Sequence, residues 1–140
     1  MRIAFFGTPA FAVPTLEALI RSRHQVAVVI TQPDRPRGRG QRVSASPVKH
    51  TAEAHGISVL QPARLDRDPW EADLSRFGTD LGVVAAYGKI LPDWLLAVPR
   101  LGLINVHASL LPRYRGASPT SAATGSMIRS PVGLAKNGML

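Results

Sequence analysis

The chain has 140 residues, of which 45% are hydrophobic, so it is long enough to bury the core of one domain and too apolar to be disordered. It contains no cysteine, which excludes disulfides, thiolate metal ligands and a cysteine nucleophile. No apolar run has the length of an export signal or of a membrane-spanning helix, so we expect a cytoplasmic protein without a membrane partner. The net charge of +8 favours polyanionic partners such as nucleic acid.

Short apolar segments rich in β-branched residues alternate with helical segments along the chain. Five of these segments are too short for helices and predict strands buried on both faces: residues 2–6, 26–31, 57–60, 81–86 and 102–107. The alternation predicts βαβ units, and therefore an α/β fold with a doubly wound, Rossmann-like, mostly parallel sheet. In such folds ligands bind beyond the carboxyl ends of the strands.

Proline and small polar residues mark the expected helix starts. The first expected turn from strand to helix lies at Gly7, Thr8 and Pro9, with Thr8 as the N-cap. Because Pro14 cannot donate a helical hydrogen bond, we expect the regular part of this helix to begin close to Pro14. Each of two later helices begins at a polar residue followed by proline and ends at a glycine: Ser46–Pro47 to Gly56, and Asp68–Pro69 to Gly78. The turn at Gly7 lacks the Gly-x-Gly-x-x-Gly spacing of dinucleotide-binding folds, so we expect no NAD.

Residues 32–46 form the most basic segment of the chain, which we expect to be an irregular loop. Four arginines lie there among glycines and prolines: Arg35, Arg37, Arg39 and Arg42. Guanidinium groups pair bidentately with phosphate, and glycine allows a backbone to approach a nucleic acid closely. Two interpretations stay open on this pattern, a nucleic-acid contact and a solvated surface loop.

Asn105 and His107 lie two residues apart near the end of the last predicted strand. Residues with this spacing face the same side of a strand, so both would project at the carboxyl edge of the sheet. Asn can donate to a developing oxyanion, and His can donate, accept or carry a proton near neutral pH. A polar strand end with a satisfied histidine explains the spacing equally well. The other histidines lack the spacing of a metal pair, and we expect no metal site.

Four motifs resemble those of one enzyme family: residues 6–9, 31–36, 85–92 and 105–116. They are similar to the motifs of the 10-formyltetrahydrofolate-dependent formyltransferases, and residues 31–36 in particular resemble the methionyl-tRNA formyltransferases. The resemblance covers residues 1–119, which would be an incomplete N-terminal formyltransferase domain. Residues 120–140 diverge from the family, contain no expected strand, and suggest a frameshifted tail.

The resemblance implies formyl transfer from 10-formyltetrahydrofolate to the amino group of initiator methionyl-tRNA, by a monomer. It assigns catalysis to Asn105 and His107. It assigns folate contacts to Ser109, Leu110, Leu111, Pro112, Ile90 and Leu91, and tRNA contacts to the four arginines named above.

The chain also departs from that family. The family uses a later aspartate to orient the histidine, whereas no acidic residue follows Asp93 here. We therefore expect poor folding, an open edge at residues 102–107, and little or no activity. Two alternatives stay open: a non-catalytic RNA-binding fragment, and a sister formyltransferase that acts on a nucleotide or sugar amine.

Overall fold

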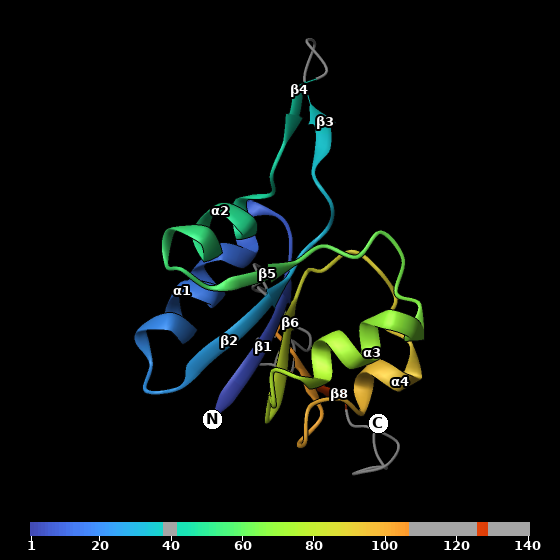
Figure 1. Cartoon of the computed structure of the whole chain (residues 1–140). Coiled ribbons are helices and arrows are strands. Elements are labelled where there is room, and N and C mark those ends of the chain that lie inside the picture. The colour runs from blue at the N-terminus through green and yellow to red at the C-terminus, as the bar shows by residue number, and fades with distance from the viewer. Residues whose placement is uncertain (38–41, 107–125, 129–140) are drawn as a thin grey trace, which may run out of the picture.

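One mixed sheet organises the computed structural model, which describes residues 1–37, 42–106 and 126–128 (Figure 1). Its strands are β1 (Arg2–Gly7), β2 (Gln25–Ile30), β5 (Ser58–Leu60), β6 (Leu81–Ala85), β7 (Leu103–Asn105) and β8 (Ser126–Ile128). They lie in the order β5-β2-β1-β6-β7-β8, with every neighbouring pair parallel except β7 and β8. This confirms the predicted doubly wound, mostly parallel sheet, and each predicted strand overlaps an observed one.

The sheet reverses its direction of growth at its centre. From β1 the chain adds β2 and then β5 on one side, and it returns to place β6 and then β7 on the other side of β1. The loops that leave β1 and β6 therefore run apart, and a crevice opens between the carboxyl ends of these strands. The fold thus sets the expected position of a ligand site before any side chain is considered.

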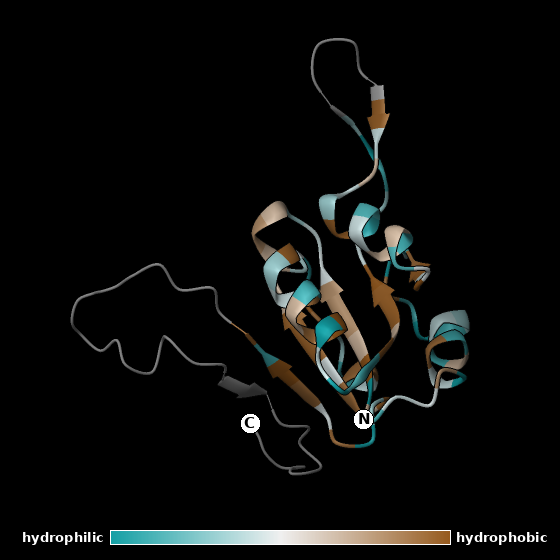
Figure 2. Cartoon of the chain, turned by 90° about the vertical axis from the view of Figure 1, so that its left-hand side faces the viewer, coloured by the Kyte–Doolittle hydropathy of each residue, from teal (hydrophilic) through white to brown (hydrophobic). Residues whose placement is uncertain are grey.

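Helices cover both faces of the sheet (Figures 1 and 2). They are the 3₁₀ turn η1 (Ala10–Ala12), α1 (Val13–Arg21), α2 (Pro47–Ala54), α3 (Arg67–Ser75) and α4 (Asp93–Leu96). Alternate residues of β1 serve the two layers: Ile3 and Phe5 pack with α1 and α2, and Ala4 and Phe6 pack with α3 and α4. No helix among the described residues is long and apolar enough to cross a membrane.

The helix starts follow the predicted chemistry except at Thr8. The regular turns of α1 begin at Val13, next to Pro14, and the Ser46 hydroxyl caps α2 by accepting from the Lys49 amide at 3.0 Å. Asp68 is extended (φ −108°, ψ 124°), so the regular part of α3 begins at the following proline. The prediction that Thr8 caps the first helix is wrong, because its hydroxyl instead donates to the carbonyl of Tyr87 at 3.0 Å.

The basic segment contains a β-hairpin, so the prediction of a wholly irregular loop is wrong. Strands β3 (Arg35–Arg37) and β4 (Arg42–Ser44) pair antiparallel and project away from the sheet (Figure 1). We call these two strands the arginine hairpin. Both strands are ribbon edges, which is where proline is tolerated, and this explains how Pro36 fits within β3.

The tail also contains a strand that the sequence did not predict. Residues 126–128 form β8, which pairs antiparallel with β7 and matches Asn105 with Ser126. The expectation of an open edge on β7 is therefore wrong over residues 103–105. The pairing requires only backbone groups, which explains why the side-chain pattern did not reveal it.

Candidate functional site

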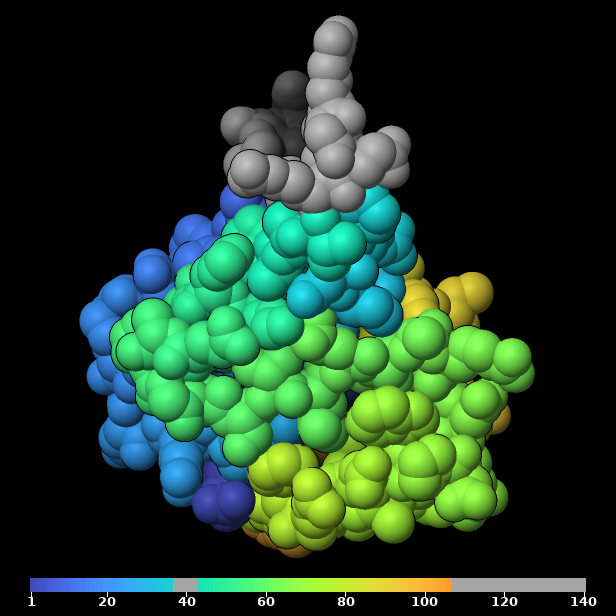
Figure 3. Space-filling view, turned by 45° about the horizontal axis from the view of Figure 1, so that its top comes forward, coloured from blue at the N-terminus to red at the C-terminus, as the bar shows by residue number. Residues whose placement is uncertain are grey.

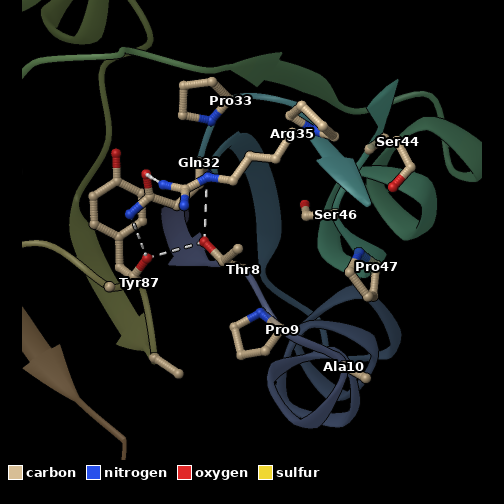
Figure 4. Close-up of a pocket in the computed structure, with 14 residues that line it drawn as sticks. Thr8, Pro9, Ala10, Gln32, Pro33, Arg35, Ser44, Ser46, Pro47 and Tyr87 are labelled. Carbon is tan, nitrogen blue, oxygen red and sulfur yellow. Dashed lines mark hydrogen bonds between the residues drawn. The ribbon is translucent and has the colours of Figure 1, made fainter. Parts of the chain in front are cut away.

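A cavity of about 650 Å³ opens at the carboxyl ends of β1, β2 and β6. Its polar lining includes Thr8 from the end of β1, Gln32 and Arg35 from the segment after β2, and Ser46 from the start of α2 (Figure 4). In Figure 3 the segments that carry Arg35 and Ser46, cyan and teal, lie at the upper end of the described surface. The cavity thus occupies the crevice that the strand order creates, at the base of the arginine hairpin.

Two side chains converge on one backbone carbonyl at the floor of this cavity. The Thr8 hydroxyl donates to the Tyr87 carbonyl at 3.0 Å, and the Gln32 amide nitrogen Nε2 donates to the same oxygen at 3.1 Å (Figure 4). The Gln32 backbone N–H also donates to the Thr8 hydroxyl at 3.3 Å. These bonds tie together the ends of β1, β2 and β6.

Gln32 is almost completely buried, with 6% of its surface exposed, and its oxygens are bonded as well. Arg35 donates through Nη2 to the side-chain Oε1 of Gln32 at 3.5 Å, and Gln61 donates through Nε2 to its backbone carbonyl at 3.2 Å. The side-chain nitrogen and oxygen of this buried amide thus each have a bonded partner, which favours one orientation of the amide.

Asp34 anchors the hairpin base to two neighbouring elements. Gln61, just after β5, donates to Asp34 Oδ1 at 2.7 Å, and Lys49 of α2 lies 3.2 Å from Oδ2. These interactions lower the pKa of the Asp34 carboxyl, first through the Gln61 hydrogen bond and then through the Lys49 hydrogen bond. Thr31 and Ser46 add a buried contact between hydroxyl oxygens 2.7 Å apart.

Close backbone approaches shape the same region. A Cβ on Gly7 would lie 2.7 Å from the Phe5 ring and 2.9 Å from the carbonyl oxygen of Ala85, so only glycine allows β1 and β6 to pack this closely. Gly88 has φ +97°, and a Cβ there would meet Gln32 Nε2 at 3.0 Å. The turn after β6 is therefore fitted against the Gln32 amide.

Comparisons with known proteins agree with this geometry. The family model described as formyl transferase matches residues 1–126. This chain belongs to the formyl transferase family. It is 55% identical over 120 residues to the methionyl-tRNA formyltransferase of Acidobacterium capsulatum and 56% identical over 123 residues to that of Ectopseudomonas mendocina. These alignments cover 85% and 88% of this chain, which spans about two fifths of each relative's length (39% in both).

Solved formyltransferase structures share the fold. The phosphoribosylglycinamide formyltransferase of Anaplasma phagocytophilum aligns with a TM-score of 0.58 at 22% identity, covering 83% of this chain and 53% of its own. The glycinamide ribonucleotide transformylase 1 of Geobacillus kaustophilus aligns with a TM-score of 0.55 at 20% identity, covering 84% and 63%. At these identities the similarity establishes the α/β architecture alone.

Of the two proposed catalytic residues of this formyl transferase chain, the structure describes one. Asn105 is the last residue of β7, is half-buried, and lies in register with Val84 of β6. Val84 belongs to the same core cluster as Leu91, so Asn105 and Leu91 lie on the same face of the sheet. His107 lies outside the described residues.

The proposed folate residues are only partly covered by the structure. Leu91 packs against the core on the α3 and α4 side, whereas Ile90 is 93% exposed and does not pack against a described part of the chain. Ser109, Leu110, Leu111 and Pro112 lie outside the described residues. The expected grouping of all six side chains therefore remains a prediction.

Three of the four proposed RNA-binding arginines lie in the two strands of the arginine hairpin. Arg35 is exposed and lines the cavity, and Arg37 of β3 lies directly opposite Arg42 of β4 in the strand register. Arg39 falls between the strands, outside the described residues. The formyl transferase chain thus places Arg35, Arg37 and Arg42 on one projecting element, with Arg35 at the cavity.

The sequence motifs did not identify the polar residues that line or support the cavity. Thr8, Gln32 and Gln61 each come just after a predicted strand, and this position was the signal that could have identified them. Tyr87 follows β6, and its ring packs edge-to-face on Phe6 with centroids 5.8 Å apart. Its buried hydroxyl finds no hydrogen-bond partner in the described part of the chain, and burial raises its pKa to about 12.

Proposed function

We propose that this chain forms the N-terminal part of a methionyl-tRNA formyltransferase, which transfers the formyl group of 10-formyltetrahydrofolate to the amino group of initiator methionyl-tRNA. The observation that carries this proposal is the 55% identity to relatives of that name across 85% of the chain. The identity to the phosphoribosylglycinamide enzymes is much lower, at 22% in the Anaplasma phagocytophilum protein. A role with a nucleotide or sugar amine is therefore the weaker candidate.

Asn105 is the described residue best placed for the chemistry. The methionyl amine attacks the formyl carbon, and the formyl oxygen becomes an oxyanion before the folate nitrogen leaves. A side-chain N–H from the carboxyl end of β7 would stabilise that oxyanion, an effect worth on the order of 3 kcal/mol per donor. His107, which the resemblance pairs with Asn105, would supply a second donor and handle the proton of the attacking amine.

The arginine hairpin supports the RNA half of the proposal. It stands beside the cavity, and its arginines suit contacts with phosphates of the acceptor stem. We propose that Arg35, Arg37, Arg39 and Arg42 bind the tRNA, and that the turn from Ser109 to Pro112 binds the folate together with Ile90 and Leu91. Affinity for RNA should then fall steeply as the salt concentration rises.

The residues after Asp93 include no acidic side chain. We infer that none of these residues supplies the carboxylate that the resemblance implies for orienting the histidine. For this reason we propose that these 140 residues alone transfer the formyl group slowly or not at all.

A chimera tests the function without depending on the activity of the chain alone. Residues 1–119 would replace the matching residues of the Ectopseudomonas mendocina relative, and formylation of methionyl-tRNA would be followed with 10-formyltetrahydrofolate. We expect transfer, and we expect Asn105→Ala to lower kcat by roughly 10²–10³-fold. Gln25→Ala, at the opposite end of the sheet, is the control and should leave kcat unchanged.

Other outcomes would decide for the alternatives. A chimera that formylates glycinamide ribonucleotide but not methionyl-tRNA would establish the sister function. A chimera that binds tRNA with a steep salt dependence, but neither binds folate nor transfers, would support the non-catalytic RNA-binding fragment.

A further inference from the structure

Gln32 is the described residue that joins the base of the arginine hairpin to the turn after β6. Its Nε2 donates to the Tyr87 carbonyl at 3.1 Å, and its Oε1 accepts from Arg35, the first residue of β3, at 3.5 Å (Figure 4). One rigid amide plane therefore contacts both elements. Tyr87 is 55 residues away from Gln32 along the chain, so no local backbone geometry requires that contact, whereas Arg35 is only 3 residues away.

The fit on the β6 side is tight. Gly88 lies so close that an added Cβ would stand 3.0 Å from Gln32 Nε2. Ala86, two residues earlier, has φ +58°, which is uncommon for a residue with a side chain. The turn therefore holds an unusual backbone shape where it receives the amide.

The remaining contacts of the hairpin base lead elsewhere. Asp34 is held by Lys49 of α2 and by Gln61 after β5, and neither residue reaches the β6 turn. Gln61 also donates to the Gln32 carbonyl at 3.2 Å, which fixes the backbone from which the Gln32 side chain extends. Asp34 and its partners thus secure the hairpin to one half of the sheet. The Gln32 side chain connects it directly to the β6 turn, and the Gln32 backbone N–H reaches the same Tyr87 carbonyl through the Thr8 hydroxyl.

We propose that Gln32 is a positioning residue that couples the turn at residues 86–88 to the arginine hairpin, so that displacement of either one displaces the other. Its consequence for catalysis rests on the proposed function. The β6 turn continues into the segment with the proposed folate residues Ile90 and Leu91, and the hairpin carries the proposed RNA-binding residues. Gln32 would then link binding on the donor side to binding on the RNA side through direct contacts.

The orientation of the hairpin can be measured without any assumption about function. The chain has no cysteine, so Val43→Cys on β4 and Ala18→Cys on α1, both exposed positions, give one specific pair of spin labels. The distance distribution between them reports how the hairpin stands on the body. Gln32→Met, which keeps the length of the side chain and removes its hydrogen bonds, should broaden or shift this distribution.

Three further variants separate coupling from a general loss of structure. Gln25→Met, at the first residue of β2 and thus at the opposite end of that strand from Gln32, should leave the distribution unchanged. Gln32→Glu keeps the acceptor for Arg35 but loses the donor to Tyr87, and it should also displace the hairpin. Gly88→Ala alters the β6 turn and places a Cβ 3.0 Å from Gln32 Nε2, so a displaced hairpin in this variant would show that a change on the β6 side is transmitted through Gln32.

Unchanged distributions in folded Gln32→Met, Gln32→Glu and Gly88→Ala chains would overturn the proposal. If a labelled variant does not fold in the 140-residue chain, the same pair in a cysteine-free form of the chimera gives the measurement. In an active chimera, Gln32→Met should raise KM for tRNA by at least about fivefold, because it removes both the hydrogen bond to the Tyr87 carbonyl and the one from Arg35, with kcat within twofold of the unmodified chimera. An inactive chimera with a displaced hairpin would contradict the proposed function and leave the positioning role supported.

Discussion

Two regions of the candidate site differ in how many polar contacts the described residues make: the region around β1, β2 and β6, and the region around Asn105 at the end of β7. Around β1, β2 and β6, the side chains of Thr8, Gln32 and Gln61 are bonded to partners far away in the sequence. Around Asn105, the structure offers a three-residue strand paired with another three-residue strand, whereas β1 has six residues. The proposed RNA side is therefore fixed by its own polar contacts, and the proposed chemical side depends on a short strand end.

The largest expected difference between these regions is in packing. Phe5 is fully buried at the sheet centre, and Phe5→Ala should lower the free energy of unfolding by about 3–5 kcal/mol. Leu103 of β7 is also buried, but it lies in the short strand, and Leu103→Ala should cost about 2 kcal/mol. Urea denaturation followed by tryptophan fluorescence measures both. Phe11→Ala is the control, because Phe11 is 60% exposed and should change little; equal losses at Phe5 and Leu103 would remove the contrast between centre and edge.

Most of the sheet could be predicted because its strands are buried on both faces and carry a strong apolar pattern. The Ser46 cap and the start of α1 near Pro14 followed from local chemistry that does not depend on the rest of the fold. Thr8 failed as a predicted cap because a tertiary partner, the carbonyl of Tyr87, competes for its hydroxyl. Local rules cannot see a partner 79 residues away.

The candidate site was predictable only in part. Asn105 was found because its spacing and position at a strand end suggest chemistry, and it does end β7. Gln32 was missed although it follows a predicted strand directly, because that position does not reveal which partners surround the side chain in space. The hairpin was missed because its prolines and glycines suggest a loop, and β8 because its pairing uses backbone groups.

The junction of β1 and β6 tests whether close packing requires a glycine in the region around β1, β2 and β6. Gly7→Ala should cost about 1–3 kcal/mol, because the carbonyl of Ala85 can move from the new Cβ only if the two strands separate. Gly78→Ala should cost roughly 1–2 kcal/mol for a different reason, since Gly78 has open space but φ +59°. Asn tolerates that backbone, so Gly78→Asn should recover part of the loss and Gly7→Asn should not. Thermal and urea unfolding of the four variants check this; recovery at Gly7 would show that packing is not the constraint.

Tyr87 is expected to be a destabilising residue in the region around β1, β2 and β6. Its hydroxyl is buried without a described partner, so Tyr87→Phe should raise the free energy of unfolding by about 1 kcal/mol. Because burial raises the pKa of Tyr87 from 10.0 to about 12, the folded chain keeps this proton when the unfolded chain has lost it. The free energy of unfolding should therefore fall as the pH rises from 10 towards 12. In the Tyr87→Phe chain, this fall should be absent. Tyr114 is present in both proteins and cancels in the difference; a destabilised Tyr87→Phe chain would show that the hydroxyl is bonded.

The smallest effect on stability is expected from Asp34, at the base of the arginine hairpin. The Gln61 and Lys49 hydrogen bonds lower the pKa of Asp34, so its contribution to stability is present above the ordinary value of 3.8 and disappears as the pH falls through the lowered one. Asp34→Asn keeps an oxygen for Gln61 but loses the charge for Lys49, and it should remove this acid dependence. The Gln61 side-chain amide signals in an NMR titration report the change, with Asp73→Asn on α3 as the control. A wild-type Gln61 signal that does not move in acid would mean that the charge of Asp34 does not hold the base of the hairpin, and that the attachment depends on the neutral amides of Gln32 and Gln61.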